Sequence, residues 1–291
     1  MQGRSPRHAC SVAATLGEGP WWSVAEQKLW FVDIKQKFLH RFDPATGKRD
    51  SWQAPAQPGW ILPTADGGLM TGLQTGLHRF DSKTGDFATV VSAEPDAQGN
   101  RLNDAAVDHR GRLWFGSMDD RERAPTGRVY VFDRGDVSAA PIDPVIITNG
   151  PAISPDGDTL YHVDTMGGRI VAYDIESDGS LGTHRLFAAI EPKDGYFDGP
   201  VTDAEGCLWI GLYAGWGARR YAPSGELLEF VRLPVANVTK LALGGPQLRT
   251  AYATTATKGL SAADRAEQPT AGDLFAFDVD VPGLPVPAIA L

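Results

Sequence analysis

The sequence contains few cysteines and no long apolar segment, and we expect no secretory leader. Its two cysteines, Cys10 and Cys207, form no Cys-x-x-Cys motif, which excludes a thiolate metal site and fits a reducing compartment. No apolar run approaches the roughly 20 residues that a membrane-spanning helix needs. The first ten residues include three basic side chains, but no hydrophobic segment follows them. We therefore expect a cytoplasmic protein that does not interact with membranes.

The chain also lacks an excess of positive charge and the familiar nucleotide and nucleophile motifs. It has 27 basic and 36 acidic residues, a formal net charge of -9, and no basic cluster. Such a chain would repel nucleic acid, whereas neutral small molecules and cations suit it better. No Gly-x-Ser-x-Gly, phosphate loop or dinucleotide fingerprint occurs, so acyl-serine and nucleotide chemistry are not indicated.

Glycine and proline, in contrast, are abundant. The 33 glycines and 21 prolines separate short segments rich in valine, leucine, tryptophan, tyrosine and phenylalanine. This composition and spacing are typical of an all-β protein. One short helix is predicted, from Ser261 to Gln268, where Ser261 and Asp264 could form a capping pair.

Six short apolar segments recur along the chain at nearly equal intervals. Their first residues lie 40, 44, 47, 48 and 43 positions apart. The segments are Leu29-Trp30-Phe31-Val32, Leu69-Met70-Thr71-Gly72, Leu113-Trp114-Phe115-Gly116, Leu160-Tyr161-His162-Val163, Leu208-Trp209-Ile210-Gly211 and Ala251-Tyr252-Ala253-Thr254. An aromatic residue and an aspartate follow in every unit but the fifth, which has Tyr221-Ala222, and a tight-turn sequence follows most of these pairs.

Units of this length and composition match the blades of a β-propeller. We predict an all-β fold, a six-bladed β-propeller with four-stranded blades and a central metal site, as a single domain over residues 1–291. A sandwich would not show six equal phases, and a helical array would show a period of 3.6 residues. Either the segment near Val12 or residues 286–291 could add the strand that closes the ring.

Four polar residues occupy one position relative to these repeats. Glu18, Asn103, Asn149 and Asp198 each precede a repeated strand by 10 or 11 residues, and three of them are followed by Gly-Pro. Residues at equal phase converge on the axis of a propeller, so we expect these side chains to lie close together. The alternative is that each one forms an Asx turn at the top of a blade.

Two carboxylates and two carboxamides provide hard oxygen ligands for one divalent metal ion. Ca²⁺ fits this ligand type best, while Zn²⁺, Mn²⁺, Mg²⁺ and Fe²⁺ remain possible. Arg101 lies two residues before Asn103, so both side chains of an extended strand would point the same way, and Arg101 could reach a ligand above the metal. The alternative for Arg101 is a surface salt bridge.

Several motifs also carry a family resemblance. They are Leu16-Gly17-Glu18-Gly19-Pro20, Trp30-Phe31-Val32-Asp33-Ile34, Arg101-Leu102-Asn103-Asp104, residues 111–118, Asn149-Gly150-Pro151, Ser154-Pro155-Asp156-Gly157 and Asp198-Gly199. In this order, and over nearly the whole chain, they resemble the regucalcin/gluconolactonase family. The Gly-Pro after Asn149 and residues 237–240 are most similar to bacterial sugar-acid lactonases acting on xylono- or arabinonolactone.

The resemblance implies a six-bladed propeller with a divalent metal held by Glu18, Asn149 and Asp198. It also implies substrate contacts from Arg101, Asn103 and Asp119. The sequence departs from the family pattern at Ser117, where threonine is common, and at Arg121, which follows the acidic pair Asp119-Asp120.

The resulting hypothesis is a metal-dependent hydrolase that opens aldonolactones of five- or six-carbon sugars to the aldonic acids. Asp198 would be the catalytic residue that accepts a proton from the attacking water. The alternatives are an aryl ester or phosphotriester hydrolase with the same metal site, and a non-catalytic calcium-binding propeller. A sugar lactone is the expected small-molecule partner, and a monomer or weak homodimer the expected assembly. The sequence does not identify the sugar or the metal.

Overall fold

The computed structural model describes residues 4–291, so that Met1 to Gly3 of the predicted domain lie outside it. Almost all regular structure is β-strand. Four separate antiparallel sheets have four strands each, ordered as in the sequence. The first contains β2 (Gly17–Ser23), β3 (Lys28–Asp33), β4 (Phe38–Asp43) and β5 (Lys48–Gln53). The second contains β6 (Pro58–Pro63), β7 (Leu69–Leu73), β8 (Gly76–Phe80) and β9 (Phe87–Val91).

The third and fourth sheets repeat this pattern. The third contains β10 (Asn100–Val107), β11 (Leu113–Asp119), β12 (Val129–Asp133) and β13 (Asp136–Ala139). The fourth contains β14 (Thr148–Ile153), β15 (Thr159–Asp164), β16 (Arg169–Ile175) and β17 (Leu181–Ala189).

The remaining strands form an eight-stranded sheet with two antiparallel halves. One half contains β18 (Tyr196–Thr202), β19 (Leu208–Tyr213), β20 (Gly217–Tyr221) and β21 (Leu227–Arg232). The other contains β22 (Val238–Gly244), β23 (Thr250–Thr255), β24 (Leu274–Asp278) and β1 (Arg7–Cys10). A single parallel residue pair, Gly199 with Lys240, joins the halves.

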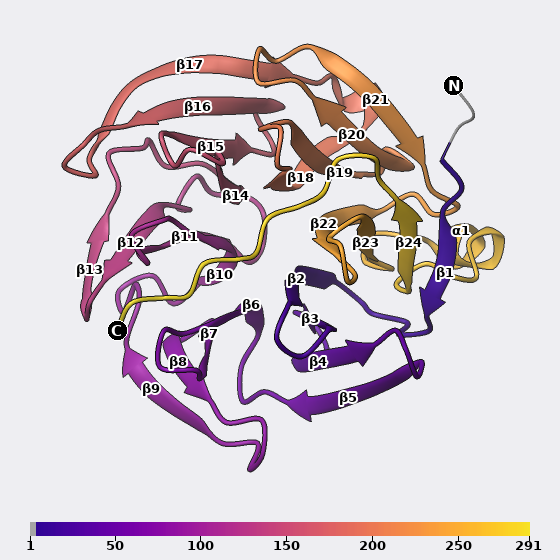
Figure 1. Cartoon of the computed structure of the whole chain (residues 1–291), viewed down its shortest axis with the longest axis horizontal. Coiled ribbons are helices and arrows are strands. Elements are labelled where there is room, and N and C mark those ends of the chain that lie inside the picture. Colours follow the sequence, from indigo (N-terminus) through magenta and orange to yellow (C-terminus); the bar gives the residue numbers. More distant parts are fainter. Residues whose placement is uncertain (1–3) are drawn as a thin grey trace.

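The sheets surround a common centre, with β2, β6, β10, β14, β18 and β22 innermost in their four-stranded units (Figure 1). These inner strands contact one another in the order β2, β6, β10, β14, β18 and β22, and β22 contacts β2 again. Such a closed arrangement of four-stranded antiparallel units is consistent with a propeller. The repeated apolar segments of the sequence form strands, as predicted, and the structure places each one second in its unit, from β3 to β23.

The two chain ends are used differently. The N-terminal strand β1 pairs with β24 and so supplies the outer strand of the last unit. The C-terminal residues cross the face of the molecule (Figure 1), where Ile289 bridges Thr64 and the Ala290 amide donates to the Gly111 carbonyl at 2.8 Å. Of the two segments that could complete the ring, the N-terminal one therefore pairs in the sheet.

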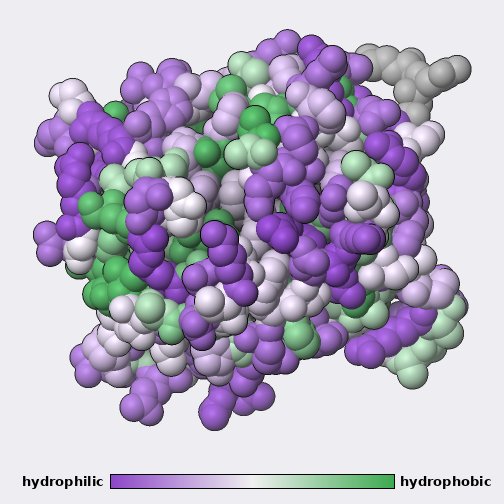
Figure 2. Space-filling model, turned by 60° about the horizontal axis from the view of Figure 1, so that its bottom comes forward, coloured by the Kyte–Doolittle hydropathy of each residue, from purple (hydrophilic) through white to green (hydrophobic). Residues whose placement is uncertain are grey.

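Helix is confined within residues 4–291 to two short elements. The 3₁₀ helix η1 (Pro192–Asp194) precedes β18, and α1 (Ala262–Glu267) lies between β23 and β24. Ser261 caps α1 in a reciprocal capping box with Asp264, which confirms the predicted pair. Neither helix is long and apolar enough to cross a membrane. Figure 2 shows one face of the molecule, on which hydrophilic residues predominate and hydrophobic ones gather in small patches.

A buried aspartate fastens the turn between the first two strands of the fifth unit. Asp203 is fully buried, and its carboxylate accepts hydrogen bonds from the Glu205 and Cys207 amides, from Trp209 Nε1 and from Arg220 Nε, at 2.8–3.1 Å. Hydrogen bonds to a buried charged group contribute more than neutral ones. This single side chain therefore ties the turn to two strands of the sheet.

Replacing Asp203 by Asn is expected to lower the free energy of unfolding by about 2 kcal/mol, because a neutral amide satisfies fewer of these donors. Urea unfolding followed by tryptophan fluorescence measures this loss. Asp178→Asn is the matched control, since Asp178 accepts hydrogen bonds from the Ser180 amide and hydroxyl in an exposed turn and its replacement should leave stability nearly unchanged. Equal stability losses in the two variants would contradict the anchoring role.

Candidate active site

Each inner strand breaks its pairing with the second strand at the same place. The register shifts between Glu18 and Trp21 in β2, and corresponding shifts occur in the other inner strands between Pro58 and Trp60, Leu102 and Ala105, Asn149 and Ala152, Phe197 and Pro200, and Val238 and Leu241. A bulge releases residues from the ladder and redirects their side chains. The polar residues that the sequence places 10 or 11 residues before each repeated strand therefore lie at these bulges.

The Gly-Pro pairs of the sequence belong to this geometry. Gly19 and Gly150 have φ of +52° and +72°, a left-handed conformation that residues with a side chain rarely adopt. Gly59 explains why the second sheet contributes no polar group, since a Cβ there would lie 2.6 Å from the Asn103 carbonyl oxygen. The close approach of β6 and β10 thus requires glycine, and the polar residues come from the other strands.

A cavity of about 270 Å³ opens at one end of the central axis. Glu18, Arg101, Asn103, Asn149 and Asp198 all line it, so the structure brings together these five residues that the sequence singled out. The remaining lining residues are Leu16, Met118, Glu122, Ile147, Thr165, Met166, Tyr196, Tyr213 and Lys258.

The two acids of this group lie in a strongly desolvated environment. Glu18 and Asp198 are only 4% and 6% exposed. Burial, and next the negative charge of Asp104, raise the pKa of Glu18 to about 7. Burial, followed by the charges of Glu18 and Asp104, raises the pKa of Asp198 well above its ordinary value. The two carboxyl groups therefore favour a positive charge placed between them, or protons in its place.

Two asparagines and an arginine form a chain of hydrogen bonds beside the acids. Asn103 Nδ2 donates to Asn149 Oδ1 at 3.0 Å and to the Thr148 carbonyl at 2.6 Å. Asn149 Nδ2 donates to Thr165 Oγ1 at 2.9 Å, and Arg101 Nη1 donates to Asn103 Oδ1 at 2.6 Å. Every amide is thus held in a defined orientation, and Asn149 Oδ1 keeps one lone pair for a further partner.

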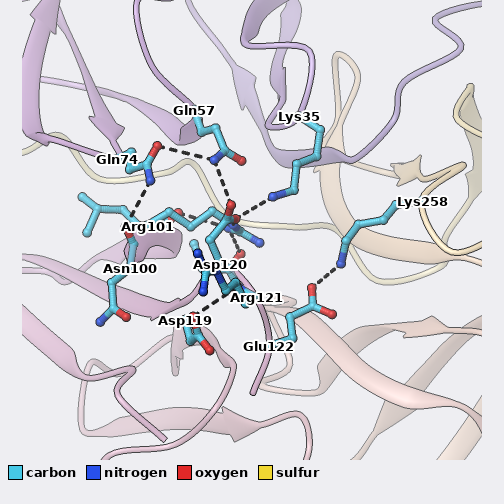
Figure 3. A network of polar contacts seen from close by, with 12 residues as sticks. Lys35, Gln57, Gln74, Asn100, Arg101, Asp119, Asp120, Arg121, Glu122 and Lys258 are labelled. Carbon is cyan, nitrogen blue, oxygen red and sulfur yellow. Dashed lines mark hydrogen bonds and ion pairs between the residues drawn. The ribbon is translucent and has the colours of Figure 1, made fainter. Parts of the chain in front are cut away.

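Arg101 is fixed from the other side by Asp120. Its Nε lies 2.9 Å from Asp120 Oδ1, and Lys35 and Gln57 donate to the same carboxylate (Figure 3). The side chain of Arg101 is 3% exposed. Arg101 thus forms a salt bridge, as one of the two alternatives held, but its own side chain is buried rather than at the surface.

Asp119 does not reach the cavity. Its carboxylate accepts hydrogen bonds from the backbone amides of Arg121, Arg123 and Ala124 at 2.9–3.1 Å. β11 ends at Asp119, and Asp120 lies in the turn that follows, where its carboxylate contacts Arg101. The sequence expectation named Asp119, whereas the structure puts Asp120 beside Arg101.

Sequence reasoning missed a buried ion pair next to the acids. Asp104 Oδ1 contacts Lys240 Nζ, and both side chains are buried. The same carboxylate accepts the amides of Ala105 and Gly150 at 2.8 and 2.9 Å. The sequence does contain a hint of this pair. Lys240 precedes the sixth repeated strand by 11 residues, the spacing shared by the polar residues of the other units, so a buried cation could have been expected there.

The donor set fits a hard divalent cation. Glu18 and Asp198 supply carboxylate oxygens, Asn149 supplies a carboxamide oxygen, and no side-chain cation contacts either carboxylate within hydrogen-bond distance in residues 4–291. This part of the chain contains no group of three or more His, Cys, Asp or Glu residues placed to hold a metal. A cation here would therefore depend on the asparagine oxygen as well as the acids.

Comparisons with known proteins find similarity to sugar lactonases and regucalcins. Residues 16–257 match the profile of the SMP-30/Gluconolactonase/LRE-like region. The chain is 35% identical to a 6-deoxy-6-sulfogluconolactonase of Pseudomonas putida, over 95% of this chain and 96% of the relative. It is 32% identical to an L-arabinolactonase of Azospirillum brasilense, over 90% and 87%. Among solved structures, a calcium-binding regucalcin of Agrobacterium tumefaciens superposes with a TM-score of 0.95 at 27% identity, over 99% and 98% of the two chains.

Proposed function

Because the chain belongs to the SMP-30/gluconolactonase/LRE-like family, we propose that it is a lactonase that hydrolyses aldonolactones to aldonic acids with one divalent metal ion. The observation that carries the proposal is the pair of buried acids, Glu18 and Asp198, at a cavity also lined by Arg101 and Asn103. The protein would be a single six-bladed propeller over residues 1–291 with the metal at its centre. The names of the lactonase relatives support this substrate class.

Glu18, Asn149 and Asp198 would hold the metal, which when bound supplies Lewis acidity toward a carbonyl and acidifies water. Asp198 would accept the proton of the attacking water, because its carboxylate lines the cavity and would lie beside the metal. Arg101 and Asn103, whose orientations are fixed by hydrogen bonds, would bind the ring hydroxyls. Ca²⁺ suits the ligand set best.

One feature of the cavity favours a second candidate, the hydrolysis of aryl esters or phosphotriesters. Leu16, Met118, Ile147, Tyr196 and Tyr213 form an apolar and aromatic part of the lining. Such a wall can pack against an aromatic leaving group as well as against the carbon face of a sugar ring. The metal site alone would not distinguish these substrates.

A substrate panel separates the two candidates. Acid release is followed in a pH-stat with pentonolactones, hexonolactones, phenyl acetate and paraoxon, using chelated protein and protein to which each divalent metal is returned. We expect the highest kcat/KM with a sugar lactone and only in the presence of metal. Faster turnover of phenyl acetate or paraoxon would replace the lactonase assignment by the second candidate.

Removing the metal is also expected to lower the melting temperature. A ligand at 100 times its Kd stabilises the folded state by about 2.7 kcal/mol, which corresponds to roughly 4–5 °C for a chain of this size. Scanning calorimetry with and without a chelator measures the shift. The shift without any lactone hydrolysis would instead support a non-catalytic calcium-binding propeller, and the absence of a shift would contradict a bound metal.

A further inference from the structure

The Lys240–Asp104 ion pair adjoins both proposed acidic ligands. Asp104 accepts the amide of Gly150, the residue after Asn149. The aliphatic stem of Lys240 packs over Gly199, the residue after Asp198, since a Cβ on Gly199 would lie 2.6 Å from Lys240 Cβ. The charge of Asp104 acts on both acids, and the charge of Lys240 acts on Glu18. The charges of this ion pair therefore influence the two acids that line the cavity.

The number of buried charges at this centre is small and can be counted. Glu18, Asp104 and Asp198 are three buried acids, and Lys240 is the cation beside them. Arg101 and the partly exposed Lys35 share the Asp120 carboxylate outside this group, so the count is restricted to the three acids and Lys240. With all three acids ionised, two negative charges remain uncompensated. A divalent cation neutralises them, whereas a trivalent cation leaves one buried positive charge, which is costly in a desolvated site.

From this charge balance we infer that Lys240 determines the charge selectivity of the cation site, favouring divalent over trivalent ions. The inference rests on the proposed metal site but goes beyond it, because Lys240 binds neither metal nor substrate in that proposal. Coulomb energy scales with the product of the charges, so a change of one charge near the site alters the affinity of a trivalent ion more than that of a divalent ion.

Two single variants change the net charge of the centre in opposite directions, and a double variant leaves it unchanged. Lys240→Met adds one negative charge to the centre, Asp104→Asn removes one, and the double variant restores the original value without the ion pair. Each is titrated with Tb³⁺ alone, followed by luminescence excited through Tyr196 and Tyr213 of the cavity, and with Ca²⁺ in competition. Circular dichroism before each titration establishes that the variant is folded.

The ratio of Tb³⁺ to Ca²⁺ affinity is the quantity to compare. We expect it to rise about tenfold in Lys240→Met, to fall about tenfold in Asp104→Asn, and to return to the parent value in the double variant. A purely structural pair would lower both affinities together and leave the ratio unchanged, which would overturn the inference. If Lys240→Met fails to fold, the other two variants decide it. A parent protein that binds neither ion would instead refute the proposed metal site.

Discussion

Asp198→Asn is expected to lower the turnover number for a sugar lactone by at least about 100- to 1000-fold, the usual loss when one charge-stabilising group is removed. Asparagine keeps the size of the side chain but cannot accept the proton of the attacking water, and it provides one weaker oxygen for a cation. The initial rate of acid release at saturating substrate measures this effect. Glu18→Gln should lose a similar factor, since Glu18 lies equally buried beside Asp198.

The fold should survive both substitutions. Each removes a buried carboxyl whose raised pKa shows that ionisation is unfavourable without a cation, so neutral replacements are tolerated. Asp178→Asn in an exposed turn is the control and should retain full activity. Near-parental turnover of folded Asp198→Asn would contradict the proposed role of Asp198.

Arg101→Met is expected to lower kcat/KM for the same lactone by about 100-fold, because truncating one member of a buried hydrogen-bonded charge pair commonly costs several kcal/mol. Arg101 bonds Asn103 and Asp120, so its loss frees the Asn103 amide and leaves the Asp120 carboxylate with less compensation. We expect most of the effect in KM if Arg101 binds ring hydroxyls. Steady-state kinetics over a range of lactone concentrations gives the two constants.

Arg79→Met provides the matched control for that experiment. Arg79 pairs with Asp66, lies more exposed, and is absent from the cavity lining. Its replacement should leave kcat/KM within about twofold of the parent, as expected for a surface ion pair. An unchanged KM in Arg101→Met would indicate that Arg101 does not contact the substrate.

The repeats made much of this architecture predictable. Equal spacing of the apolar segments predicted one strand in each unit, and these are the second strands, which are buried on both faces. The equal phase of Glu18, Asn149 and Asp198 predicted their convergence, because a bulge recurs at that point of each inner strand. Local sequence was therefore enough to predict the features that recur in every unit.

Prediction ended where contacts depend on residues far apart in sequence. Asp104 and Lys240 are 136 residues apart, and only the closure of the ring brings them together. The choice between Asp119 and Asp120 depends on which side of the chain faces Arg101 after β11 ends, and neither propensity nor spacing determines that direction. The role of β1 likewise depends on which strand edge remains free once the other units have formed.

We expect the carboxyl pair Glu18 and Asp198 to support lactone opening only when a divalent cation is bound beside it. The most direct measurement is a pH-stat titration of chelated protein with Ca²⁺, at a protein concentration well above Kd, with a sugar lactone as substrate. We predict that the rate of acid release rises to a plateau at one equivalent in the parent protein and stays at the background rate in folded Asp198→Asn. A full rate in chelated protein, or an equal rise in the variant, would contradict the claim.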